Sequence, residues 1–245
     1  MLIDKTTYDF DADPSISTTL WTPADISTIA WYDANDVATI TESAGLVSQW
    51  DDKSTNGYHM VQGTGSKQPA YTTDKITFTS DSLHVTTGPT LSTPHSVFII
   101  SDYAGANTNN QYLFDSTGRS VIGESGTSGW GIYNGAWLWS TGLNPINETI
   151  ISAVFNSTSS AVYHDGTSVL SGNSGSGQMS GLLVLCDSYL ETGAVYFNGF
   201  LREVIIIDNA DTTTRQKIEG YLAWKWSLEA NLPSGHPYEF AAPTV

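Results

Sequence analysis

The chain has 245 residues, with 25 acidic residues against 9 Lys and Arg, so its formal net charge is −16. This charge argues against binding to nucleic acid, whose phosphates attract Lys and Arg, and against an anionic membrane surface. Hydrophobic residues make up 40% of the chain and eight residues are Trp, which is enough apolar material for a folded core. The single cysteine, Cys186, excludes a disulfide framework within the chain and a zinc site built from cysteines.

The first 22 residues differ from the rest of the chain. Asp9, Asp11 and Asp13 alternate with other residues and are followed by a Ser/Thr-rich stretch that ends at Trp21. Such a polar stretch has little apolar surface to bury. We therefore expect residues 1–22 to form an extended arm that docks on other proteins.

The spacing of the three aspartates is similar to the start of a calcium-binding loop. Leu20, however, stands where such a loop needs a bidentate Glu. We therefore expect no cofactor, with calcium at the arm as the alternative, and we assign no metal ligands. The first residues also lack the basic and apolar regions of a signal peptide, and no apolar run reaches the roughly 20 residues that a membrane helix needs.

From residue 23 onward, short runs of β-branched and aromatic residues are separated by Gly, Asn, Asp and Ser. Residues 96–100, 149–155 and 203–207 are almost continuously apolar, which is typical of strands covered on both faces. Residues 46–50 alternate, as in a half-exposed strand. About a dozen such runs predict an all-β fold built as a two-sheet antiparallel sandwich.

One segment near the end of the chain has a helical pattern. Ile218, Leu222 and Trp226 recur at intervals of four, and Thr213 with Gln216 matches a capping box. We predict a single C-terminal amphipathic helix over residues 211–229.

Three stretches of the chain together resemble a known family. They are residues 23–34, which contain Trp-Tyr-Asp, residues 47–57, which contain Gln-Trp-Asp-Asp, and residues 218–238, which contain Tyr-Leu-Ala-Trp-Lys-Trp. They resemble the concanavalin A-like (laminin-G-like) lectin/glucanase superfamily, in the form found in bacteriophage structural proteins. The resemblance implies a jelly-roll sandwich of two curved sheets, which we place at residues 23–245.

The resemblance also implies a function. It points to a non-enzymatic virion structural protein, either a capsid decoration subunit or a tail or fibre subunit, assembled in the host cytoplasm. Its partners would be other virion proteins, bound through the arm, and further copies of the chain, a trimer by analogy. The alternative is a glycan-binding adhesin that is extracellular or on a bacterial surface, and a third candidate is a glycoside hydrolase.

A hydrolase of this fold would need two carboxylates that face each other. The Glu-x-Asp-x-x-Glu motif of the glucanases is absent, and Glu203 and Asp208 would point to opposite faces of a regular strand. No pair of histidines has the spacing of a metal site. We therefore predict no catalytic residues and no enzyme activity.

An aromatic platform for a surface polysaccharide is the remaining candidate site. Trp137 and Trp139 are two residues apart and so share one face of a strand, and Trp130 would lie across an Asn-Gly hairpin from them. Aromatic faces of this kind stack on sugar rings. The alternative is that Trp137 and Trp139 face the core. The predicted glycan-binding residues are Trp130, Tyr133, Asn134, Trp137 and Trp139, with Tyr103 at the rim.

Overall fold

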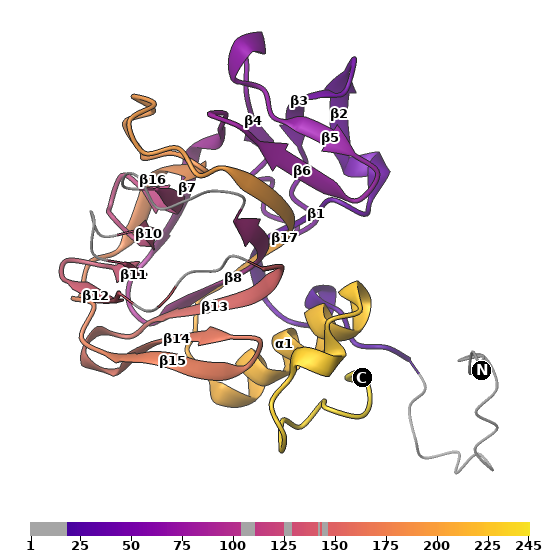
Figure 1. The fold of residues 1–245 in the computed structure, drawn as a ribbon, viewed down its shortest axis with the longest axis vertical. Coiled ribbons are helices and arrows are strands. Elements are labelled where there is room, and N and C mark those ends of the chain that lie inside the picture. Colours follow the sequence, from indigo (N-terminus) through magenta and orange to yellow (C-terminus); the bar gives the residue numbers. More distant parts are fainter. Residues whose placement is uncertain (1–18, 104–110, 125–128, 142, 144–146) are drawn as a thin grey trace.

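The computed structural model describes residues 19–103, 111–124, 129–141, 143 and 147–245 (Figure 1). Seventeen strands in these residues join in one antiparallel sheet that curls until it is nearly closed into a barrel. The all-β prediction is therefore confirmed at this level. The expected division into two separate sheets is not seen, because pairing between β3 and β5 makes the sheet continuous.

Two halves of the sheet face each other. In the first half, β1 and β8 both flank β17, and pairing continues outward from β8 to β15 and from β17 to β5. Its strands are β1 (Thr28–Asp33), β5 (Ala70–Thr72), β6 (Lys75–Phe78), β8 (His95–Tyr103), β13 (Thr149–Phe155), β14 (Ser160–His164), β15 (Thr167–Gly172) and β17 (Gly199–Ile207).

In the second half, neighbouring strands follow the order β2-β3-β4-β7-β16-β9-β10-β11-β12. Its strands are β2 (Ile40–Ser43), β3 (Leu46–Trp50), β4 (Met60–Val61), β7 (Leu83–Leu91), β9 (Tyr112–Ser116), β10 (Val121–Glu124), β11 (Trp130–Tyr133), β12 (Trp137–Ser140) and β16 (Met179–Leu185).

The apolar strands at the centre of the first half are covered on both faces, as their composition predicts. Along β8, Val97 and Ile99 point into the core between the two halves of the sheet. Phe98 and Ile100 point the other way, into a second core beneath helix α1 (Thr212–Trp226). The helix therefore covers the outer face of β8, β13 and β17 (Figure 1).

The helix differs from its prediction at its start and on its buried face. Its N-cap is Asp211, whose side chain accepts a hydrogen bond from the amide of Thr214 at 2.7 Å, so the capping box expected at Thr213 does not form. The buried face also carries an ion pair, with Arg215 Nη1 2.6 Å from Glu219 Oε2. The buried face of the helix, which the sequence predicts to be apolar, therefore consists of apolar residues together with this ion pair.

The described part of the N-terminal segment packs on the body of the protein. Leu20 forms a β-bridge with Thr244, and the amide of Val245 donates to the carbonyl of Thr19 at 3.1 Å. Trp21, which the sequence places in the predicted arm, is buried with its ring edge-on to Tyr221. The arm aspartates Asp9, Asp11 and Asp13 lie outside the described residues.

No helix in the described ranges is long and apolar enough to cross a membrane.

Candidate functional site

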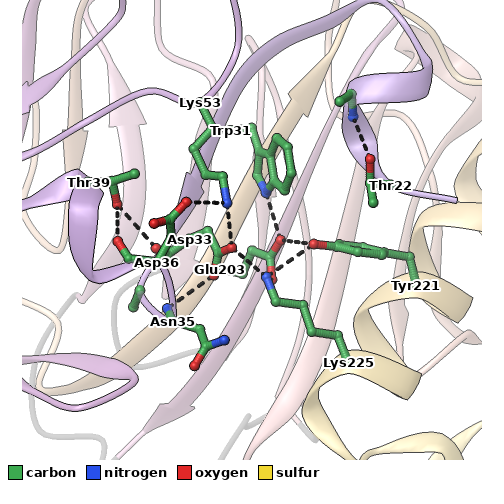
Figure 2. Close-up of polar contacts among 12 residues, drawn as sticks. Thr22, Trp31, Asp33, Asn35, Asp36, Thr39, Lys53, Glu203, Tyr221 and Lys225 are labelled. Carbon is green, nitrogen blue, oxygen red and sulfur yellow. Dashed lines mark hydrogen bonds and ion pairs between the residues drawn. The ribbon is translucent and has the colours of Figure 1, made fainter. Parts of the chain in front are cut away.

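Charged and aromatic side chains gather in two places. The first, here called the Glu203 network, consists of Trp31 and Asp33 of β1, Lys53, Glu203 of β17, and Tyr221, Lys225 and Trp226 of α1. Figure 2 shows most of these side chains converging from the sheet and the helix on the Glu203 carboxylate. Asp33 is the direct cross-strand partner of Glu203. The network thus contains two neighbouring carboxylates, the element that sequence analysis did not find.

Glu203 is fully buried, and each of its oxygens accepts two hydrogen bonds. Its Oε1 accepts from the indole of Trp31 at 2.7 Å and from the hydroxyl of Tyr221 at 2.9 Å. Its Oε2 accepts from Lys225 Nζ at 2.7 Å and from the indole of Trp226 at 2.6 Å. Four donors saturate the carboxylate, so these contacts join the helix to the sheet and leave no open side toward a ligand.

Asp33 is held by two cations. Its Oδ2 is 2.9 Å from Lys53 Nζ and 2.7 Å from Lys225 Nζ. Burial acts to raise the pKa of Asp33, but Lys225 and Lys53 outweigh it and hold this pKa below its usual value. Burial raises the pKa of Glu203 despite the opposing effect of Lys225. Lys225 is thus the shared cation of two acids.

This network explains the residues that carried the family resemblance. Trp31, Tyr221 and Trp226 come from its first and last stretches, and all three donate to Glu203. Asp52, from the middle stretch, accepts a hydrogen bond from the amide of Trp31 at 2.9 Å. The residues of these stretches therefore pack the helix, and the loop that carries Asp52, against β1 and β17.

The second place is the outer aromatic face, which consists of Tyr112 of β9, Tyr133 of β11, and Trp137 and Trp139 of β12. Tyr133 pairs with Trp137 across the strands, and their ring centres are 5.4 Å apart. The ring of Tyr112 lies 6.3 Å from that of Trp137. The first three rings are half-buried, and Trp139 is 40% exposed.

Two features hold this face in place. Asn134, in the turn between β11 and β12, is buried and is fixed by its own hydrogen bonds to Ser174 and Gly177. Gly123 lies beside Tyr112 in the β9–β10 pair, and a Cβ added to it would come within 2.8 Å of Tyr112 Cδ1. The missing side chain at Gly123 lets the Tyr112 ring lie against the sheet. The aromatic rings are therefore presented on a fixed backbone.

A charge pair lies among these rings. Arg119 Nη1 is 2.7 Å from Oδ2 of the buried Asp115, and the guanidinium lies over Tyr112, Tyr133 and Tyr189. Burial raises the pKa of Asp115 to about 6, although the Tyr189 amide and Arg119 act to lower it. Arg119 and Asp115 could not be predicted as site residues from the sequence, because no motif surrounds them.

The predicted glycan-binding residues divide between this face and the interior. Tyr133, Trp137 and Trp139 lie on the outer aromatic face, and Asn134 supports the turn beneath it. Trp130 is only 3% exposed and packs inside the barrel against the ring of Tyr103, which is also buried. Neither Trp130 nor Tyr103 can present its ring to a sugar in this structure.

The position of Trp130 follows from the length of the turn. A two-residue Asn-Gly turn would pair Tyr133 with Ala136 and bring Trp130 opposite Trp139. The observed loop has three residues, so Tyr133 pairs with Trp137 and Trp130 pairs with Ser140. A shift of one residue reverses the face on which a side chain lies. Trp130 therefore points inward while Trp137 and Trp139 point outward.

Of the predicted arm residues, Trp21 lies within the described part of the chain. Trp21 belongs to the core beneath the helix, and the arm aspartates lie outside the described residues. Within the ranges that the structure describes, no three His, Cys, Asp or Glu side chains are grouped as metal ligands.

No family model and no curated protein matches the chain. Solved structures do match. A Trypanosoma rangeli sialidase in complex with sialic acid aligns with a TM-score of 0.54 and 10% identity, over 82% of this chain and 35% of the sialidase. Domain 4 of an extracellular arabinanase from Geobacillus stearothermophilus, in complex with arabinotriose, aligns with a TM-score of 0.56 and 14% identity, over 77% of this chain and 95% of that domain. The chain therefore spans about a third of the sialidase and nearly the whole arabinanase domain.

These likenesses correct the functional predictions. The prediction of a non-enzymatic virion structural protein is contradicted, because the neighbours are a sialidase and a domain of an arabinanase. The prediction that the chain is not an enzyme is contradicted on the same ground. The concanavalin A-like and bacteriophage assignments find no support in these neighbours. At 10 and 14% identity, what the chain shares with them is the fold.

Proposed function

We propose that the chain is a carbohydrate-recognition domain of a carbohydrate-active protein and that the outer aromatic face is its glycan-binding surface. The observation that carries this proposal is Trp139, which is 40% exposed in a row of aromatic rings on an anchored hairpin. Single exposed apolar side chains are common on protein surfaces, but a contiguous group of rings at the surface is typical of a binding site. Flat aromatic rings suit the C–H faces of sugars.

The fold gives further support. The arabinanase domain, which this chain covers almost completely, was solved with a bound arabinotriose, and the sialidase with sialic acid. A row of rings on a sheet offers an extended surface, which suits a segment of polysaccharide. The fixed hairpin lowers the entropy cost of ordering the rings when a ligand binds.

The test is binding of the full chain to soluble polysaccharides, measured by calorimetry, with Trp139→Ala and Trp137→Ala as variants. We expect each variant to lose about tenfold or more in affinity, since a central aromatic contact is worth roughly 2 kcal/mol. Phe240→Ala is the matched control, because Phe240 is 84% exposed and belongs to the C-terminal segment, outside the outer aromatic face. Figure 1 shows the C-terminus and β12 on different sides of the molecule. Unchanged affinity in the Trp variants, or binding of no glycan by the wild type, would contradict the proposal.

A further inference from the structure

Arg119 lies in the middle of the aromatic rings. Its guanidinium carbon is 5.1 Å from the ring centre of Tyr189, 5.5 Å from that of Tyr112 and 5.8 Å from that of Tyr133. Its side chain is 31% exposed. A ligand that covers Tyr112 and Tyr133 therefore also meets this cation.

The charge of Arg119 is already matched from within the protein. Asp115, 2.7 Å away, is fully buried, and it also accepts hydrogen bonds from the amides of Ser116 at 2.8 Å and Tyr189 at 3.0 Å. Asp187 is a second buried acid, near enough to act on Asp115 electrostatically. The net charge of Arg119 together with these two acids is therefore zero or negative, depending on how many of the acids are ionised.

An acidic sugar would meet a cation whose charge Asp115 already matches. The remaining N–H groups of Arg119 can still donate hydrogen bonds, but the pair as a whole offers little net attraction to a second carboxylate, and taking the Asp115 contact itself would leave a buried carboxylate without its partner. The net charge of −16 also repels anionic polymers as they approach. A neutral sugar meets neither obstacle, because it needs only ring faces and hydrogen-bonding groups.

We propose that the outer aromatic face binds neutral glycans and discriminates against acidic ones, with the Asp115–Arg119 pair as the specificity-determining element. This inference rests on the proposed function and adds the class of ligand to it.

The first experiment compares glycans with the wild-type chain. The probes are an array of neutral and acidic glycans together with polygalacturonate and its methyl ester, which share one backbone and differ in charge. We expect the bound glycans to be neutral, with acidic counterparts about tenfold weaker or more. Equal or preferential binding of acidic glycans overturns the inference but leaves glycan recognition standing. Binding of no glycan at all overturns the proposed function as well.

The second experiment removes the matching charge with Asp115→Asn, which keeps the size of the side chain. The affinity for acidic glycans should rise about tenfold and fall again with added salt, while the affinity for neutral glycans changes less than about threefold. Asp208→Asn is the matched control, because it makes the same change in net charge at an exposed position outside this face. No gain for acidic glycans in Asp115→Asn overturns the proposal.

A change of pH tests the same pair without a substitution, should Asp115→Asn fail to fold. Burial raises the pKa of Asp115 to about 6, and Arg119 and Asp187 are the charged groups that face it. At pH 5 Asp115 is mostly protonated, whereas sugar carboxylates are still ionised. The wild type should therefore bind acidic glycans more strongly at pH 5 than at pH 7.5. An equal or weaker affinity at pH 5 overturns the proposal.

Discussion

The Glu203 network and the outer aromatic face use the same kinds of groups in different ways. Each places a buried carboxylate beside a cation and surrounds them with aromatic rings. In the network, Trp31 and Glu203 are covered, and the indole and phenol donors point inward to one carboxylate. On the face, the rings lie at the surface and the charge pair lies among them. Where neighbouring elements bury such a cluster, it holds the helix on the sheet. Where its rings stay partly exposed, it is available to a ligand.

The largest effect is expected from Glu203→Ala. The substitution leaves Lys225 with one acid and removes the acceptor of two indoles and a phenol, so the free energy of unfolding should fall by about 3–5 kcal/mol. Urea unfolding measures this change. Glu42→Ala, at an exposed position on β2, is the control and should stay within about 1 kcal/mol of the wild type. The folded Glu203→Ala variant should keep the glycan affinity of the wild type. A lower affinity measured below its melting temperature would show that the Glu203 network and the outer aromatic face are not independent.

Lys225→Met is expected to act less strongly and in a way that depends on pH. At pH 7 it should cost about 2–3 kcal/mol, because Asp33 and Glu203 lose their shared cation. The lowered pKa of Asp33 contributes stability above its unfolded value of 3.8, and this contribution is lost as the pH falls through the folded value. The variant lacks this contribution, so its deficit should shrink in acid. Unfolding curves from pH 7 to pH 3 measure the deficit, and one that grew in acid would contradict the assignment.

The smallest change tests the support of the outer aromatic face. Gly123→Ala would place a methyl group 2.5 Å from the carbonyl oxygen of Gln111 and 2.8 Å from the ring of Tyr112. We expect a loss of about 1–2 kcal/mol in stability and a weaker glycan affinity, because the Tyr112 ring must move. Gly63→Ala is the matched control, since a Cβ there meets nothing within 4 Å. An unchanged affinity in Gly123→Ala would show that the position of Tyr112 is unimportant.

Local patterns in the sequence predicted the elements but not their register. The apolar runs of β8, β13 and β17 are covered on both faces as predicted, and the single helix lies close to its predicted bounds. The position of Trp130 was missed because one extra residue in the turn after Tyr133 reverses the face, and an Asn-Gly pair does not fix the loop length.

Local sequence patterns could not predict the Glu203 network or the Asp115–Arg119 pair with its aromatic neighbours, because their members are far apart in the chain. Trp31 and Glu203 are 172 residues apart, and Asp115 and Tyr189 are 74 apart. Only the pairing of strands far apart in the chain brings such residues together. The residues around Trp31 and Tyr221 belong to the stretches that carried the family resemblance, but no local pattern indicates that they share Glu203 as a partner.

The two described ends of the chain meet, as Leu20 bridges to Thr244 beside the helix. The described polypeptide therefore begins and ends at the same corner of the fold. Strands β11 and β12 lie on the other side of the molecule (Figure 1). The junction of residues 19–20 with residues 244–245 is therefore remote from the hairpin that carries Trp137 and Trp139.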